Sequence, residues 1–134
     1  MWFQAKSCQN TISNNIVFNI PRAGILFNDN FGGGNDCFNN LLFNTCTESG
    51  DHGNINAWSR QQWLTKVKYG YESFDSLYTH IHDNFLIANY GAGWGIDLDD
   101  GSSWFKIYNN FQHQSLGLKN DYGGFNVYYY NNIN

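Results

Sequence analysis

Short apolar stretches recur along the chain beside pairs of asparagine residues. Five copies of this element begin with an aromatic or aliphatic residue, continue with Asn-Asn or Asp-Asn, and end on an apolar residue. They lie at residues 12–16, 38–41, 81–85, 107–111 and 129–133. Successive copies, measured between positions 14, 39, 83, 109 and 131, are 25, 44, 26 and 22 residues apart. The 44-residue gap corresponds to one period of about 24 residues plus an insertion of about 20 residues.

A second element follows each of the first four copies. It is a short run in which apolar residues alternate with other residues, and this period of two predicts β-strands rather than helices. The four runs lie at residues 23–27, 53–57, 94–98 and 115–119. Short strands and polar turns that repeat every 22 to 26 residues are typical of a β-solenoid, in which each coil contacts only its neighbours.

The asparagine pairs have a physical role in such a solenoid. Equivalent residues of successive coils lie one strand spacing apart, about 4.8 Å. An Asn side chain carries one acceptor and two donors, so amides stacked at that spacing can form a continuous hydrogen-bonded ladder. Asn also tolerates the left-handed backbone of a sharp turn. We therefore predict that part of the asparagine marks a turn that is repeated in every coil.

Composition agrees with a folded domain. The chain has 134 residues, 42% of them hydrophobic and 19% aromatic, so it is unlike a disordered sequence. Its net charge is −4, and its seven Lys and Arg residues are scattered, which argues against nucleic-acid binding. No apolar run approaches the ~20 residues of a membrane-spanning helix. We expect a single domain over residues 1–134, with a loop insertion at about 61–79.

Cysteine usage and the N-terminus carry little information. The three cysteines are Cys8, Cys37 and Cys46, and none of them forms a C-x-x-C pair. Zinc-finger spacing is therefore absent, and three buried free thiols are favoured over one disulfide with a spare thiol. The first residues lack the basic segment and apolar run of a signal peptide. The chain contains 21 Asn but no glycosylation sequon, so glycan attachment does not account for the asparagine.

Two longer stretches carry a resemblance to a known group of proteins. They are residues 48–60 (ESGDHGNINAWSR) and residues 93–103 (GWGIDLDDGSS). Together with the Asn-Asn repeats, they resemble the right-handed parallel β-helix superfamily, the pectate-lyase-like fold, and a central portion of its carbohydrate-active members. The resemblance implies an all-β, right-handed parallel β-helix of about five coils, lacking one or both end caps. It also implies a polysaccharide or oligosaccharide partner and an extracellular location.

The second stretch contains the strongest candidates for catalysis. If Ile96 and Leu98 face the core, Asp97 and Asp99 face outward, about 6.6 Å apart along one strand. Alignment of the coils places Asn56 beside Asp97, and Lys119 beside either Asp97 or Asp99. Paired carboxylates can act as acid and as nucleophile or base on a glycosidic bond. The catalytic candidates are Asp97, Asp99 and His52, and the substrate-binding candidates are Glu48, Asp51, Asn56, Trp58, Arg60, Asp100 and Lys119.

These residues leave several functions open. Glycan binding with glycoside hydrolysis is favoured, and we expect no cofactor and no metal site. The rival chemistry is that of a polysaccharide lyase, in which Asp97, Asp99 and Asp100 bind Ca²⁺, although their spacing is not that of an EF-hand loop. The rival class is a non-catalytic β-helix module, or a fragment of a larger enzyme, that self-associates through open solenoid ends. The same Asp residues can equally serve solvation and turn hydrogen bonds.

Overall fold

Parallel β-strands make up the regular structure of the protein in a computed structural model. The structure describes residues 2–3, 8–28, 33–59, 77–90 and 93–134. No helix occurs within these ranges. Accordingly, the described part of the chain contains no helix long and apolar enough to cross a membrane.

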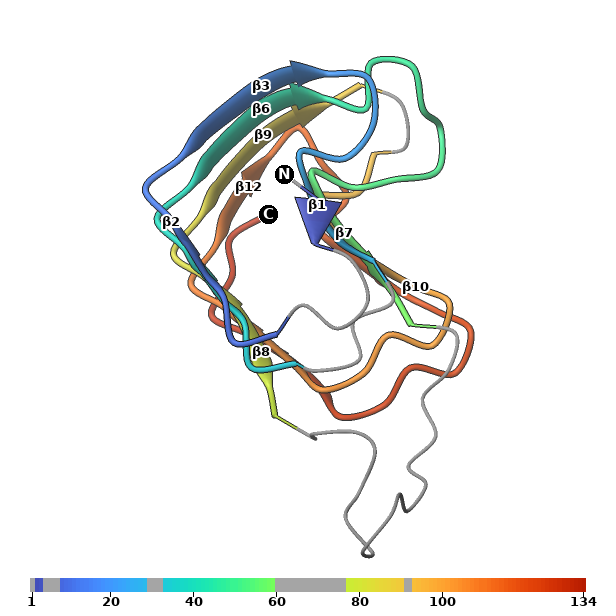
Figure 1. The fold of residues 1–134 in the computed structure, drawn as a ribbon. Coiled ribbons are helices and arrows are strands. Elements are labelled where there is room, and N and C mark those ends of the chain that lie inside the picture. The colour runs from blue at the N-terminus through green and yellow to red at the C-terminus, as the bar shows by residue number, and fades with distance from the viewer. Residues whose placement is uncertain (1, 4–7, 29–32, 60–76, 91–92) are drawn as a thin grey trace, which may run out of the picture.

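The strands form three parallel sheets that enclose one core (Figure 1). Sheet A consists of β1 (Trp2–Phe3), β4 (Ile25–Asn28), β7 (Ile55–Trp58), β10 (Ile96–Asp99) and β13 (Leu118–Asn120). Sheet B consists of β2 (Thr11–Ser13), β5 (Asp36–Phe38), β8 (Thr79–His82), β11 (Phe105–Tyr108) and β14 (Val127–Tyr130). Sheet C consists of β3 (Ile16–Ile20), β6 (Leu41–Thr45), β9 (Phe85–Asn89) and β12 (Phe111–His113).

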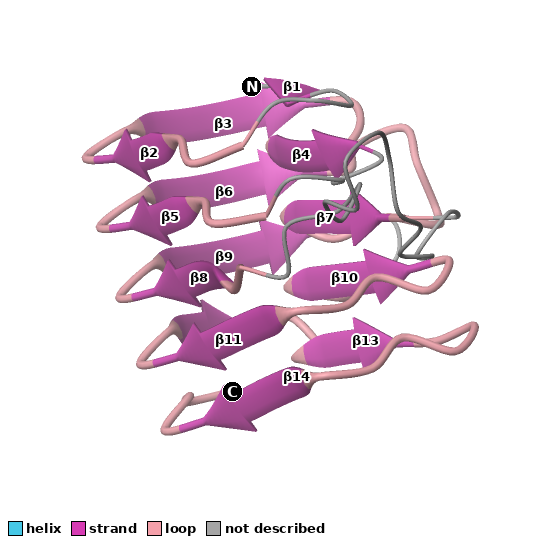
Figure 2. Ribbon diagram, turned by 60° about the horizontal axis from the view of Figure 1, so that its bottom comes forward, coloured by secondary structure: helices cyan, strands magenta, loops and turns pink. Residues whose placement is uncertain are grey.

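The chain visits sheets A, B and C in turn and then returns to sheet A one level along the axis (Figure 2). This path makes the molecule a right-handed parallel β-helix, as the sequence predicts. The four period-two runs contribute strands β4, β7, β10 and β13 of sheet A. The coils stack in register, so that Ile25, Ile55, Ile96 and Leu118 form one inward-facing column.

The core lies inside the coils and is built from stacked aliphatic side chains. Ile25, Ile55 and Ile96 are fully buried, as are Leu42 and Leu86 from sheet C. The alternation of residues along each strand produces this core, because every second side chain points inward. Burial of one such side chain contributes about 2 kcal/mol, so the repeated columns supply most of the stabilisation of the coils.

The Asn-Asn element forms the corner between sheets B and C. Its first residue has a left-handed backbone in every copy, with φ between 52° and 59°. Its second residue points inward and forms a ladder in which each side-chain amide donates to the oxygen of the next at 2.9 Å. The ladder runs through Asn15, Asn40, Asn84, Asn110 and Asn132. Both predicted roles of Asn are confirmed: the first residue of the pair adopts the left-handed backbone of the turn, and the second residue forms the ladder.

The predicted insertion separates β7 from β8. Residues 60–76 lie outside the described residues, and the chain re-enters sheet B at Thr79. The cysteines are free thiols, as the sequence predicts. Cys37 and Cys46 are buried, but Cys8 is exposed, so the prediction of three buried thiols is wrong for Cys8. Self-association through the ends of the solenoid stays a prediction.

Candidate functional site

Strand β10 places two carboxylates on the outer face of sheet A. Ile96 and Leu98 face the core, so Asp97 and Asp99 point to the other side. In the register of the sheet, Asp97 lies between Asn56 of β7 and Lys119 of β13. The structure therefore selects the pairing of Lys119 with Asp97, one of the two registers that the sequence allowed.

The ammonium group of Lys119 lies at the centre of a carboxylate cluster. Its nitrogen is 3.3 Å from Asp97 Oδ1 and 3.5 Å from Asp99 Oδ1. It is also 3.3 Å from Asp121 Oδ2 and 3.7 Å from Asp51 Oδ1. We call these five residues the Lys119 cluster. It joins the loop before β7, strand β10 and the end of β13, which are segments of three successive coils.

Asp97 is the most deeply placed member of the Lys119 cluster. Its side chain points to the outer face, as the alternation along the strand predicts, but it is covered there and has 0% exposure. Burial raises the pKa of Asp97 from 3.8 to about 7; Lys119 opposes this shift, and Asp99 and Asp121 add to it. A carboxyl group with this pKa can release or take up a proton near neutral pH, which suits a general acid or base.

The charges of the cluster shift the pKa values of Lys119 and Asp121. Burial alone lowers the pKa of Lys119, but the carboxylates of Asp97 and Asp99 outweigh burial and hold that pKa above its ordinary value. Partial burial and a hydrogen bond with Asp99 raise the pKa of Asp121. Sequence reasoning missed Asp121, although it follows Lys119 at the i+2 position and so belongs on the same side of an extended chain.

A tight turn after β10 orients Asp99. The Asp99 side chain accepts a hydrogen bond from the backbone N–H of Asp100 at 3.0 Å. The Asp99 carbonyl oxygen accepts one from the Ser102 hydroxyl at 2.8 Å. Asp100 has a left-handed backbone, with φ of 41°. Among the predicted site residues, Asp100 therefore acts as a turn residue that positions Asp99.

His52 lies beside the cluster and is held by two side chains. The Arg22 guanidinium donates to His52 Nε2 at 2.9 Å, and His52 Nδ1 bonds the Ser49 hydroxyl. Because Arg22 can only donate, Nε2 must be the unprotonated nitrogen of a neutral ring. Burial and the charge of Arg22 lower the pKa of His52, in agreement with that state. This network makes His52 a positioned neutral imidazole at the edge of the face.

Trp58 supplies the aromatic surface that the sequence predicts. It lies beside Asp99 in the register of sheet A, and the Arg22 guanidinium is 5.1 Å from its ring centroid. Arg22 thus links Trp58 with His52, and sequence reasoning missed it because it comes from the preceding coil. A short period-two run follows it directly, but no feature of the sequence distinguishes Arg22 from a solvated surface arginine.

The other predicted substrate-binding residues differ in their positions. Glu48 is exposed and makes no ion pair with any residue that the structure describes. Arg60 lies outside the described residues, so its predicted role in substrate binding stays a prediction. Asn56 is buried, and its amide donates to the Asp97 carbonyl oxygen at 3.3 Å.

The cluster is arranged around an ammonium group and not around a space for a metal ion. Lys119 occupies the centre of the carboxylates, which is the position that a cation such as Ca²⁺ would need. Within the ranges covered by the structure, no three His, Cys, Asp or Glu side chains are placed to hold a metal ion together. The donor set therefore does not fit the calcium of a polysaccharide lyase.

Comparison with protein-family models, with curated proteins and with solved structures gives no match for this chain.

Proposed function

We propose that this chain is a glycan-binding and glycan-processing protein of the pectate-lyase-like superfamily, with glycoside hydrolase chemistry on the outer face of sheet A. The observation that carries the proposal is the pairing of two carboxylates with different environments on strand β10. Asp97 is buried with a pKa of about 7, whereas Asp99 lies nearer the surface with 19% exposure. Two neighbouring carboxyl groups, one buried and one partly exposed, are typical of a catalytic acid and its partner.

The proposed roles follow from this difference in burial. Asp97 is the proton donor to the leaving sugar oxygen, and Asp99 is the carboxylate that acts as nucleophile or base. Both carboxylate oxygens lie within 3.5 Å of the same nitrogen, so they are at most about 7 Å apart, which suits a catalytic pair. Lys119 must move away for a sugar to reach Asp97, because that carboxyl group is covered in the free protein.

The binding surface around the carboxylates has the chemistry of a sugar site. Trp58 offers a half-buried ring, and Asp51 offers a carboxylate with 78% exposure. The His52 ring and the Arg22 guanidinium lie beside them. An aromatic ring with a few polar groups converging on it is the usual composition of a small-molecule site.

Turnover of a polysaccharide panel tests this proposal. We expect Asp97→Asn and Asp99→Asn each to reduce turnover at least 100-fold, because general acid and nucleophile contributions are of this order. Asp36→Asn is the matched control, since it makes the same change on strand β5 of sheet B, outside the Lys119 cluster. Activity that survives both substitutions on β10 would contradict the proposal.

A second candidate is a non-catalytic module in which the Lys119 cluster is a structural ion network. The observation that favours it is the complete burial of the Asp97 side chain against Lys119. This candidate predicts that Lys119→Met destabilises the fold and that no substrate in the panel is cleaved. Removal of one partner from a buried ion pair costs about 3 kcal/mol, so urea unfolding measures the effect directly.

A further inference from the structure

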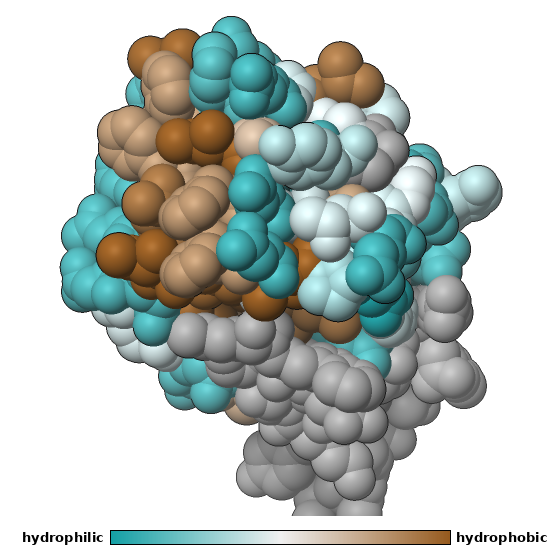
Figure 3. Space-filling model, turned by 90° about the horizontal axis from the view of Figure 1, so that it is seen from above, coloured by the Kyte–Doolittle hydropathy of each residue, from teal (hydrophilic) through white to brown (hydrophobic). Residues whose placement is uncertain are grey.

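The outer face of sheet C is apolar over four coils. The first and third residues of each strand of sheet C point outward on either side of an inward-facing residue, and all of these outward residues except His113 are aliphatic or aromatic. Asn19 and Asn44, later in β3 and β6, are polar and bond to each other at the edge of this face. The outward residues form two rows across the strands, Ile16-Leu41-Phe85-Phe111 and Phe18-Phe43-Ile87-His113. Figure 3 shows hydrophobic residues gathered on the face seen from above.

This apolar surface is open to solvent. Ile16 has 67% exposure, Phe85 54% and Phe18 49%. The ring of Phe18 stacks on Phe43, with ring centroids 5.0 Å apart, and Phe85 lies 5.3 Å from Phe111. The rings thus hold one another in place along the solenoid axis. A row of exposed apolar side chains that continues over four coils makes this face a candidate site of interaction.

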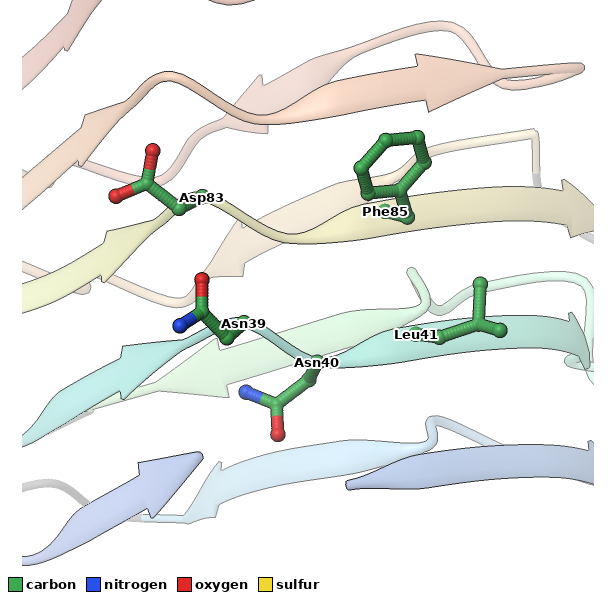
Figure 4. A pocket seen from close by; sticks show the side chains of 5 residues that line it. All are labelled: Asn39, Asn40, Leu41, Asp83 and Phe85. Atoms are coloured by element: carbon green, nitrogen blue, oxygen red, sulfur yellow. The ribbon is translucent and has the colours of Figure 1, made fainter. Parts of the chain in front are cut away.

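Two hollows with both apolar and polar lining lie at opposite ends of strand β9. The first, with a volume of about 380 Å³, precedes the strand and is lined by Asn39, Asn40, Leu41, Asp83 and Phe85 (Figure 4). The second, of about 340 Å³, follows the strand and is lined by Ala88, Asn89, Tyr90 and Gln114. Asn39 and Gln114 are exposed, and within the described residues their side-chain amides make no hydrogen bond. Each hollow therefore offers free donors and acceptors beside an apolar surface.

We propose that an extended, uncharged oligosaccharide binds on sheet C along β9, with one end in each hollow. The sugar rings lie over Phe85 and Ile87, and the hydroxyl groups at the two ends bond the amides of Asn39 and Gln114. Strand β9 spans about 13 Å from Phe85 to Asn89, which gives room for a short oligosaccharide between the two hollows. This site lies on a different sheet from the Lys119 cluster and does not depend on catalysis there.

The footprint of the surface favours a small ligand over a second copy of the chain. Four strands at about 4.8 Å spacing and about 13 Å of strand length give a footprint near 250 Å². A stable protein interface buries about 800 Å² on each partner, so this face is too small to hold a dimer by itself.

The backbone pairing and the charges of sheet C exclude some classes of ligand. Strands β6 and β9 pair on both sides within sheet C, so a peptide cannot join the sheet between them as an added strand. A ligand on this face must use side chains, and amides beside apolar rings fit the mixed polar and C–H surfaces of a sugar. Neither hollow is lined by a Lys or Arg residue, so a uronate polymer would find no cation there to pair with its carboxylates.

Titration of the full chain with defined oligosaccharides tests this site. The probes are β-1,4-linked gluco-, manno- and xylo-oligosaccharides of increasing length, with oligogalacturonides as charged comparison. We expect at least one neutral series to bind more tightly as it lengthens. Phe85→Ser and Gln114→Gly should each weaken that binding about tenfold or more, the scale of one buried ring or one well-placed hydrogen bond.

The variants are chosen to leave the fold intact. Phe85 is more than half exposed, and Gln114 has a left-handed backbone with φ of 55° that glycine adopts without strain. Ile16→Ser is the matched control, because Ile16 is an equally exposed apolar residue of the same face, outside the two hollows. It should retain full binding.

Three results would overturn the proposal. The first is that no neutral series binds. The second is that Ile16→Ser and Phe85→Ser lower the affinity for the oligosaccharide equally. The third is that Asp97→Asn lowers this affinity while Phe85→Ser retains it. The last result would place the sugar on sheet A. Sedimentation gives a further check, since a dimer that Phe85→Ser dissociates would identify the face as a contact between copies. Failure of hydrolysis in the polysaccharide panel leaves these binding measurements unaffected.

Discussion

The corner between sheets B and C and the outer face of sheet A follow opposite rules. At the corner, each coil repeats the same arrangement of one left-handed residue and one buried amide, with equal ladder distances of 2.9 Å. On sheet A, equivalent positions change chemistry from coil to coil, from Leu26 through Asn56 and Asp97 to Lys119. The repeat builds the scaffold, and the departure from the repeat concentrates charge in one place.

The two regions differ in the contacts that hold them in place. Each ladder amide is bonded to the coils on both sides, so its contribution is shared along the axis. The Lys119 cluster has no equivalent in other coils, and its members are held by turns and loops that surround β10. Substitutions in the two regions should therefore differ in what they damage.

The largest expected effect is on stability, at the centre of the ladder. Asn84→Ala removes the oxygen that accepts from the backbone N–H and the side-chain amide of Asn40, and it removes the amide that donates to the carbonyls of Cys37 and His82. We expect it to lower the free energy of unfolding by about 3 kcal/mol or more, because several buried polar groups lose partners together. Urea unfolding measures the change. A decrease in the free energy of unfolding of less than about 1 kcal/mol would show that the ladder does not stabilise the corner.

On the outer face of sheet A, the expected effect is a pH dependence of the free energy of unfolding. The pKa of Asp97 is raised from 3.8 to about 7, so between these values the folded state holds a proton that the unfolded state has lost. The contribution of Asp97 to the free energy of unfolding is therefore highest below pH 3.8, falls by at most about 1.4 kcal/mol per pH unit as pH rises towards 7, and then levels off. Asp97→Asn should remove this part of the slope in urea unfolding. An unchanged slope in the variant would assign the titration to another group.

The smallest effect is expected at the exposed member of the asparagine pair. Asn109 is exposed and has φ of 56°, a conformation that costs an ordinary residue about 1 kcal/mol. Asn109→Ala should lose about that amount, whereas Asn109→Gly should stay within about 0.5 kcal/mol of the parent. Equal losses in both variants would mean that the Asn109 side chain, rather than its backbone conformation, supports the corner.

Much of the fold could be predicted because the repeat is local. A stacked Asn is recognisable from its spacing and from the apolar residues beside it, and the same periodicity aligns Ile55 with Ile96. The register then places Asn56 beside Asp97 without further information. The exposed position of Cys8 escaped prediction, because it precedes the first regular coil.

The candidate site could be predicted only in outline. Its residues on β10 follow from strand alternation, but Arg22, Ser49 and Asp121 join it from loops and turns that carry no periodic signal. The burial of Asp97 also escaped prediction, since alternation gives the direction of a side chain and not what covers it. The apolar outer face of sheet C is visible in the sequence only once the strands of that sheet are known.

By itself, the sequence determined the architecture of this protein: a parallel β-helix whose coils are held in register by asparagine. It could do so because one short pattern, repeated at nearly constant spacing, specifies both the turn and the stacking. Tertiary structure alone decided which carboxylate is buried, which cation it meets and which outer face stays apolar. Those properties depend on contacts between residues of different coils and on irregular loops, where side-chain environment is set by distance in space and not by position in the repeat.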